Sequence, residues 1–349
     1  MENKDHERIP FKQVLDALLD DTHLFPPVYL HRFSDLDAKN LNALKDIWAQ
    51  VPVIRRRALL EDLEEIAEVD TLVSFEDLAR YALNDEDAQV RMTAIRLLWE
   101  DEDRKLVPTF IRMMEHDPDS QVRAAAATAL GLFVYLGELE EIPEETHQLV
   151  EDKLILTVKG EDLPLVRRRA LEALGFSSRE EVSDLLRENY ERGNIEWLAS
   201  ALYAMGRSAD NKWGPAVMRM FSHPEAEVRE EAVRAAGELE LTAARDALID
   251  ALQDDSDENV QMAAVWSLSQ IGGNEVRPLL ERLLSESEDD AIADFIEEAL
   301  ENLSFTEDMA NFEMFDIDLD EDETGPAKPP KNSGSNPESK RSGGRKSKK

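Results

Sequence analysis

The stretch Asp117-Pro118-Asp119-Ser120-Gln121-Val122-Arg123, followed by Ala126, Leu130 and Gly131, decides the fold of this chain. Its order is an acidic turn, Val-Arg, alanine four residues after the valine and glycine nine residues after it. Seven copies of this pattern, some with substitutions, occur in the 349 residues, and most are 31 to 36 residues apart. Their anchor positions are Ile54, Val90, Val122, Val166, Trp197, Val228 and Val260. A fixed period of this size is typical of stacked helical hairpins.

Each repeat is predicted to hold two amphipathic helices joined by the acidic turn. In the third repeat, apolar residues at helical spacing predict a first helix over residues 105–115 and a second over 121–133. The turn carboxylates are expected to cap the second helix, because they accept hydrogen bonds from its free N–H groups. The glycines nine residues after the anchor are expected to end that helix in the left-handed conformation. These glycines are Gly131, Gly175, Gly206 and Gly237.

Within the second helix, the anchor and the residues four and eight positions later share one face, which we expect to point into the stack. The residue at the fourth position is alanine in all seven copies, and its small side chain allows neighbouring helices to approach closely. These alanines are Ala58, Ala94, Ala126, Ala170, Ala201, Ala232 and Ala264.

An arginine follows the anchor in five of the seven copies. We expect each to pair with a turn carboxylate of its own or the adjacent repeat, so that the pairs form a ladder along the solenoid. The arginines are Arg55, Arg91, Arg123, Arg167 and Arg229. Trp197-Leu198 replaces Val-Arg in the fifth copy, and the ladder is expected to break there.

The string D-x-x-V-R-x-x-A-x-x-A-L-G resembles the HEAT repeat, particularly the short bacterial form that is similar to phycobilisome-lyase repeats. The resemblance extends over about residues 40–303. It implies an all-α, right-handed α-solenoid of the armadillo-like kind, with seven to eight helical hairpins; a weaker eighth copy begins near Ile292. Because the repeat residues are structural ones, the resemblance indicates the fold and says little about activity.

Composition divides the chain into four parts. Residues 1–38 are predicted to form an irregular N-terminal cap with a short helix, and residues 39–303 the HEAT-repeat solenoid. Residues 304–324 form an acidic-aromatic segment, and residues 325–349 a disordered basic tail rich in Gly, Pro, Ser and Lys. The spacing of 44 residues between Val122 and Val166 is assigned to an added acidic loop at residues 137–146.

The charge of the chain argues against nucleic-acid binding by the solenoid. The net charge is −36, but residues 325–349 carry eight basic side chains and one acidic, which leaves 32 basic and 75 acidic side chains, or −43, for the rest. An acidic body repels phosphate backbones and anionic membranes, whereas the tail attracts them. With no cysteine, no apolar region in the first 13 residues and no uncharged stretch of membrane-spanning length, we expect a soluble, cytoplasmic monomer.

No catalytic residue, cofactor or metal site is predicted from the sequence. The six histidines are scattered, and no nucleotide-binding or hydrolase motif occurs. Deoxyhypusine hydroxylase, an enzyme of this fold, holds two irons with His-Glu pairs on its repeats, but the only such pair here, His6-Glu7, lies outside them. The acidic cluster at residues 254–258 lacks the spacing of a calcium loop and is interpreted as a capping turn.

A protein-binding face is predicted instead. Positions two and six residues after each anchor are expected on the concave side, where they form a comparatively neutral stripe with aromatic residues and arginines, the usual anchors of protein interfaces. The predicted binding residues are Met92, Arg96, Arg168, Tyr203, Arg234, Met262 and Trp266. The alternative is that Tyr203 and Trp266 are buried against neighbouring helices.

These features favour a non-enzymatic scaffold or adaptor that binds other proteins along a concave face. The alternatives are a nucleic-acid- or ribosome-associated factor tethered by the basic tail and a bilin-lyase-like enzyme. The tail cations are Lys340, Arg341, Arg345, Lys346, Lys348 and Lys349. They could equally keep the chain soluble or contact its own acidic body. Residues 304–324 are either the last helix with an acidic linker or a linear motif containing Phe312 and Phe315.

Overall fold

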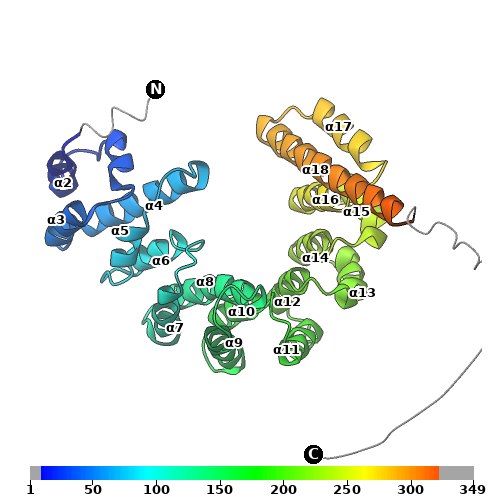
Figure 1. The fold of residues 1–349 in the computed structure, drawn as a ribbon, viewed down its shortest axis with the longest axis horizontal. Helices are drawn as coiled ribbons and strands as arrows, with labels where there is room; N and C mark the ends of the chain where they lie inside the picture. The colour runs from blue at the N-terminus through cyan, green and yellow to red at the C-terminus, as the bar shows by residue number, and fades with distance from the viewer. Residues whose placement is uncertain (1–8, 322–349) are drawn as a thin grey trace, which may run out of the picture.

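The chain folds into a curved stack of helical hairpins (Figure 1). The computed structural model describes the backbone of residues 9–321 and the side chains of residues 9–306. Successive hairpins follow an open arc, and no strand occurs within residues 9–321. The predicted all-α solenoid is therefore confirmed.

Each hairpin places its first helix on the outer side of the arc and its second helix on the inner side (Figure 1). The outer helices are α3 (Ala38–Trp48), α5 (Glu76–Ala82), α7 (Val107–His116), α9 (Glu144–Lys159), α11 (Glu180–Glu191), α13 (Gly214–Arg219), α15 (Arg245–Asp254) and α17 (Val276–Glu286). The inner helices are α4 (Val53–Val69), α6 (Ala88–Arg96), α8 (Ser120–Glu138), α10 (Pro164–Ala173), α12 (Ile195–Arg207), α14 (Ala226–Glu238), α16 (Glu258–Ile271) and α18 (Asp290–Glu321).

Shorter elements complete the stack. Helix α2 (Phe11–Leu19) and the 3-10 turn η1 (Pro27–Phe33) cover the first hairpin and bury aromatic and aliphatic side chains against it. Four 3-10 turns flank the outer helices: η2 (Arg104–Leu106), η3 (Asn211–Trp213), η4 (Met220–Ser222) and η5 (Thr242–Ala244).

The acidic turns cap α6, α8 and α16 as predicted, whereas α4, α10 and α14 begin without a side-chain cap. Asp87 accepts hydrogen bonds from the N–H groups of Gln89 and Val90, and Asp119 does the same at the start of α8. Asp257 caps α16, which gives the acidic cluster at residues 254–258 its structural role. The caps satisfy N–H groups that the helix itself leaves free.

The repeat frame predicted for the first copy is wrong by one residue. Ile54, the predicted anchor, is 77% exposed, and Ala58 is exposed as well. Leu59 is buried instead, which moves the anchor to Arg55 and the ladder arginine to Arg56. The pair Ile54-Arg55 looks like Val-Arg in sequence, but burial of the leucines sets the face of α4. In the other six copies the alanine at the fourth position is fully buried.

The predicted left-handed glycines at the ends of the inner helices are also wrong. Gly131, Gly175, Gly206 and Gly237 are absent from the residues with positive φ among those described. Each instead faces the next inner helix at close range: a Cβ atom on Gly131 would lie 3.3 Å from the Cα of Ala173. The glycines remove a side chain where two helix backbones meet, rather than allowing an unusual backbone angle.

The predicted arginine ladder forms in part. Arg91, Arg123 and Arg229 pair with a carboxylate of the next turn as predicted, whereas Arg55 donates to the carbonyls of Asp20 and His23 and Arg167 to that of Val158. Arg91 donates two hydrogen bonds to the carboxylate of Asp117, at 2.7 and 2.8 Å, and one to the carbonyl of Asp85 in its own turn. Equivalent hydrogen bonds lower the pKa of Asp162 and of Asp255. The pairs of this kind are Arg56–Asp85, Arg91–Asp117, Arg123–Asp162 and Arg229–Asp255. Each links two successive repeats with charge-assisted bonds in a largely buried position.

The predicted break in the ladder occurs around Trp197. Arg167 donates to the carbonyl of Val158 and stacks on the Trp197 ring at 5.3 Å. Arg192, which occupies the place of the acidic partner in the next turn, stacks on the same ring at 5.4 Å. Two cations therefore contact one aromatic ring at a place where four other turns have ion pairs.

The added residues between the third and fourth repeats mostly lengthen helices. The predicted loop at residues 137–146 is shorter than expected, because α8 continues to Glu138 and α9 begins at Glu144. Only residues 139–143 connect the two helices. At the C-terminal end, the backbone of residues 304–321 belongs to α18. Phe312, Phe315 and the basic tail lie outside the described side chains, so their roles stay predictions.

The close approach of the inner helices predicts a graded response to alanine at the glycine positions. A Cβ atom on Gly237 would lie 2.7 Å from the Cα of Ser267, whereas the closest atom to a Cβ on Gly131 would be 3.3 Å away. We expect Gly237→Ala to lower the free energy of unfolding by about 1–3 kcal/mol. For Gly131→Ala, the gain in helix propensity of about 1 kcal/mol offsets the milder contact. Denaturant titration of both variants checks this, and equal losses would contradict it.

The ladder makes a second prediction. Arg91→Met leaves the carboxylate of Asp117, whose side chain is 7% exposed, without its cation. We expect a loss of about 2–4 kcal/mol in the free energy of unfolding. The matched control is Arg187→Met, which removes an exposed pair with Asp184 and should cost at most about 1 kcal/mol. A similar cost for both variants in denaturant titrations would show that the ladder adds no more than an ordinary surface ion pair.

Candidate protein-binding surface on the concave face

The pattern of glycine nine residues after the anchor is interrupted at Trp99, which lines a groove. Trp99 stands nine residues after Val90, where four later repeats have glycine. Helix α6 already ends at Arg96, and the indole is 63% exposed.

The groove has a volume of about 740 Å³ and lies across inner helices α4, α6 and α8. Its walls include the predicted binding residue Arg96, the Trp99 indole and the small side chains of Ala125, Thr128 and Ala129 on α8. The connection between α4 and α5 adds Val73 and Phe75. We call this feature the N-terminal groove.

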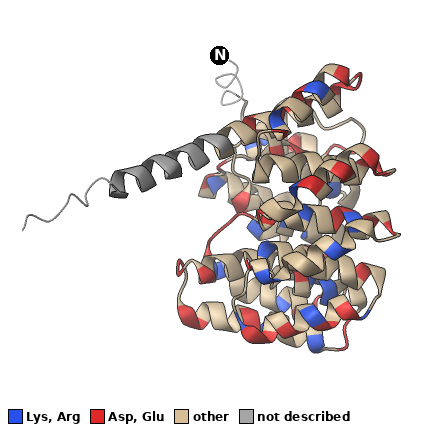
Figure 2. Cartoon of the chain, turned by 90° about the vertical axis from the view of Figure 1, so that its right-hand side faces the viewer, with Lys and Arg blue, Asp and Glu red and all other residues tan. Residues whose placement is uncertain are grey.

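The rim of the N-terminal groove is acidic. Its carboxylates are Glu64, Glu68, Asp70, Glu76, Glu100 and Asp101. Arg96 is the one basic residue among the described lining residues, and Glu64 binds its guanidinium with hydrogen bonds of 2.5 and 2.6 Å. Arg80 pairs with Asp101 from outside the groove. The groove thus combines an exposed indole and apolar walls with four uncompensated carboxylates, those of Glu68, Asp70, Glu76 and Glu100. Across the molecule, acidic residues also gather at many turns (Figure 2).

A second hollow brings three of the predicted binding residues together. Arg234, Met262 and Trp266, from α14 and α16, line a pocket of about 370 Å³ with Phe295 of α18. Glu230 accepts a hydrogen bond of 2.9 Å from Arg234 and lines the same pocket. We call this feature the C-terminal pocket.

A charged aromatic cluster lies on α12 and α14, in the middle of the concave face. Arg207 stacks on the Tyr203 ring at 4.5 Å. Burial raises the pKa of Glu231 to about 7, because no hydrogen-bond partner reaches its Oε2 atom and the cation of Arg234 offsets only part of the desolvation. Burial likewise raises the pKa of Glu238.

The remaining predicted residues are less accessible. Met92 is half-buried and packs against the core. The guanidinium of Arg168 donates a hydrogen bond to the backbone carbonyl of Glu196 and forms an ion pair with the carboxylate of the same residue. Tyr203 and Trp266 are half-buried, so each keeps an accessible part. Trp99 is not among the predicted binding residues. Of the described residues that lie nine positions after an anchor, it is the one with a large aromatic side chain.

Comparison with known proteins places the fold among helical-repeat solenoids. The family model described as HEAT repeats matches residues 76–144 and 214–301, so the chain contains HEAT repeats in both regions. The sequence matches none of the curated proteins with which it was compared.

Several solved structures share the architecture. The complex of CpcE and CpcF of phycocyanin lyase from Nostoc sp. PCC7120 is 18% identical, with a TM-score of 0.50, and the match covers 81% of this chain and 97% of that one. YibA from E. coli is 16% identical over 79% of this chain and 95% of its own, with a TM-score of 0.41. Human deoxyhypusine hydroxylase is 17% identical over 75% and 95%, with a TM-score of 0.33. At sequence identities this low, the similarity concerns the fold of the chain and not its function.

The hydropathy of the helices gives one further finding. Within the described residues, no helix combines the length and apolar character required to cross a membrane.

The buried carboxyl group of Glu231 predicts a pH dependence of stability. Its pKa is about 7 in the folded chain against 4.5 for an ordinary glutamate, so the folded state binds the proton more tightly. Stability from this group is therefore present at low pH and is lost as the pH rises through 7. The facing charges are Arg234, which lowers the pKa, and Glu172, Glu230 and Glu238, which raise it.

Glu231→Gln removes this titration. We expect the variant to gain about 1–3 kcal/mol in free energy of unfolding relative to wild type as the pH is raised from about 5 to about 8. Exposed Glu227 lies on the same helix, and Glu227→Gln is the control, which should show no such gain. Denaturant titrations at several pH values measure the difference. A constant difference for Glu231→Gln would mean that the group does not titrate in this range.

Proposed function

We propose that this protein is a non-enzymatic scaffold or adaptor that holds segments of other proteins along its concave face. HEAT-repeat stacking creates an extended inner surface, which is the part such solenoids use for binding. The observation that carries the proposal is the N-terminal groove, where an exposed tryptophan stands at a position that later repeats fill with glycine. An indole that is 63% exposed contributes little to the core, so its accessible surface is available to a partner.

The chemistry of the groove specifies the segment that fits it. Apolar walls and the Trp99 indole favour an aliphatic or aromatic side chain, and exposed tryptophans are frequent energetic centres of interfaces. The uncompensated carboxylates of the rim favour lysine or arginine next to that side chain. The proposed ligand is therefore a peptide segment of a partner protein with basic residues around an apolar one. The C-terminal pocket offers a second contact point of similar composition.

The two alternative functions have weaker support. An acidic concave face repels phosphate, so nucleic-acid or ribosome binding would depend on the basic tail, which lies outside the described residues. A bilin-lyase-like activity is suggested by similarity to the phycocyanin lyase subunits, and that similarity concerns the fold alone.

A peptide selection tests the proposed function. From a randomised library displayed on phage, the full-length chain should enrich peptides that carry Lys or Arg next to an apolar residue. For a selected peptide, fluorescence polarisation should show at least a tenfold (~1.4 kcal/mol) loss of affinity with Trp99→Ala. The matched control is Leu156→Ala, which truncates an apolar side chain exposed on outer helix α9 and should leave affinity unchanged.

The same experiment separates the solenoid from the tail. A chain that ends at Thr324 should bind the peptide with the affinity of the full-length chain, and nuclease treatment should have no effect. Binding lost with the tail, or equal for the Trp99 and Leu156 variants, would remove the N-terminal groove from the function. Thermal unfolding of each variant confirms that the fold is retained, because Trp99 is exposed and its truncation leaves the core intact.

A further inference from the structure

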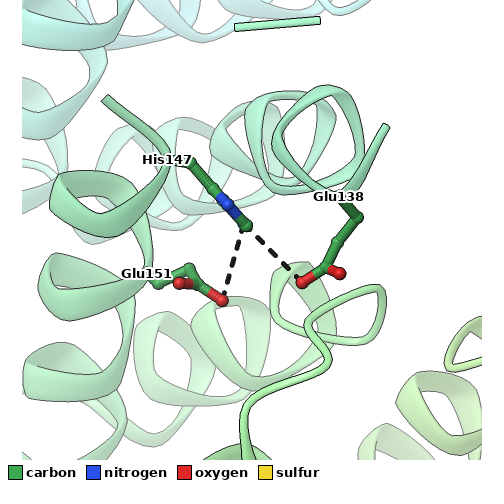
Figure 3. Close-up of side chains that lie close together, drawn as sticks. All are labelled: Glu138, His147 and Glu151. Carbon is green, nitrogen blue, oxygen red and sulfur yellow. Dashed lines mark ion pairs between the residues drawn. The ribbon is translucent and has the colours of Figure 1, made fainter. Parts of the chain in front are cut away.

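A histidine and two glutamates converge where the added residues join the third and fourth repeats (Figure 3). Glu138 ends α8, and His147 and Glu151 lie one turn apart on α9. The His147 Nε2 atom is 3.7 Å from Glu138 Oε1 and 3.6 Å from Glu151 Oε1. The three ligand atoms all lie within 4.8 Å of one another.

The burial of this cluster distinguishes it from the acidic turns on the surface. His147 is 8% exposed and Glu151 is 2% exposed. The Nε2 atom of His147 has no hydrogen-bond partner, although it points toward both carboxylates. A buried polar atom without a partner is costly, and distances of 3.6 and 3.7 Å are too long for hydrogen bonds. The imidazole is therefore directed at two oxygen atoms that it does not bind.

These distances fit a metal ion between the three groups. Two donors on a tetrahedral ion with bonds of about 2.1 Å lie roughly 3.4 Å apart. The two separations from His147 Nε2 exceed this by a few tenths of an ångström, and the two glutamate oxygens lie within 4.8 Å of each other, so movement of the partly exposed Glu138 side chain completes the coordination. We propose that His147, Glu138 and Glu151 bind one first-row divalent transition-metal ion, of which Zn²⁺ is the reference case. Imidazole nitrogen selects this class over Mg²⁺ and Ca²⁺, which prefer oxygen ligands alone.

Neighbouring groups hold the ligands in place. Glu151 Oε1 accepts a hydrogen bond from the hydroxyl of Ser177, and Glu138 Oε1 accepts one of 2.8 Å from the N–H of Ser178. Arg179 Nη1 lies 3.6 Å from Glu151 Oε2, the oxygen that faces away from His147 in this arrangement. Hydrogen bonds of this kind orient metal ligands and are a regular feature of built sites.

The glycine before Glu138 is part of the same arrangement. A Cβ atom on Gly137 would lie 2.2 Å from the Cγ and Cδ2 atoms of the His147 ring. Only glycine leaves room for the imidazole in its observed position. The site would link the end of α8, the start of α9 and the connection after α10, and so fix the added segment within the stack.

This inference goes beyond the proposed binding function, and its signal in the sequence is modest. His147 and Glu151 are four residues apart on one helix face, a spacing that suits two ligands of one ion. Glu138 lies nine residues before His147, on another helix, and only the hairpin brings it near. The three residues form neither an adjacent His-Glu pair nor a calcium-loop spacing, so the sequence alone does not indicate a metal site.

Isothermal titration calorimetry tests the site. The full-length chain, treated with a chelator and dialysed, is titrated with ZnCl₂ at neutral pH, with and without excess Mg²⁺. We expect one ion per chain, bound with an affinity that Mg²⁺ does not reduce. His147→Ala and Glu151→Gln should each weaken binding at least about tenfold. The matched control is His116→Ala, an exposed histidine 3.8 Å from Glu115, which should bind as wild type does.

Two further measurements keep the outcome independent of folding defects. Glu138→Gln changes a partly exposed ligand, so the variant should fold and still lose affinity. Co²⁺ bound to wild type should give visible absorption bands that Gly137→Ala weakens, because the added Cβ displaces the imidazole. No stoichiometric binding to folded wild type would overturn the proposal. So would equal affinity of wild type and the His147 variant, since the ion would then lie on acidic surface groups.

Discussion

The structure depends on the close approach of successive inner helices. From α8 to α16, the glycine nine residues after each anchor faces the residue seven positions after the next anchor, which is Ala173, Ala204, Ala235 or Ser267. Fully buried alanines at the fourth position extend this contact along the helices. Close packing of small residues brings two backbones together and leaves no room for added atoms. The curvature of the arc and the regular presentation of its inner face follow from this contact.

Ion pairs supplement the packing at the turns. Four arginines, Arg56, Arg91, Arg123 and Arg229, each bind a carboxylate of the following turn. The last three also bind carbonyls of their own turn, so ion pairs and hydrogen bonds connect repeats whose helices pack through small residues. The ladder breaks where Arg167 and Arg192 both stack on Trp197. The glycine pattern is interrupted at Trp99, which lines the N-terminal groove. Departures from a repeat pattern mark candidate functional positions, because the packing of the repeats does not require them.

The candidate site was only partly predictable, for a physical reason. Residue types and helical phase placed Arg234, Met262 and Trp266 on one surface, and they do line one pocket. The hydrophobic periodicity of a helix indicates which face is buried but not the distance to the neighbouring helix, so the groove beside Trp99 was not predicted. The burial that raises the pKa of Glu231 also comes from neighbouring helices rather than from its own.

The sequence by itself indicated seven to eight hairpins, the acidic caps of α6, α8 and α16, three ion pairs of the ladder and its interruption, because each depends on residues at a fixed spacing. The tertiary structure decided what that spacing could not. Leucine burial shifted the frame of the first repeat away from Ile54, and helix contacts showed that Gly237 and its equivalents serve packing. The meeting of Glu138 with His147 likewise required the fold of a hairpin. Periodicity specifies which face of a helix is buried, whereas distances between faces arise only when the helices pack.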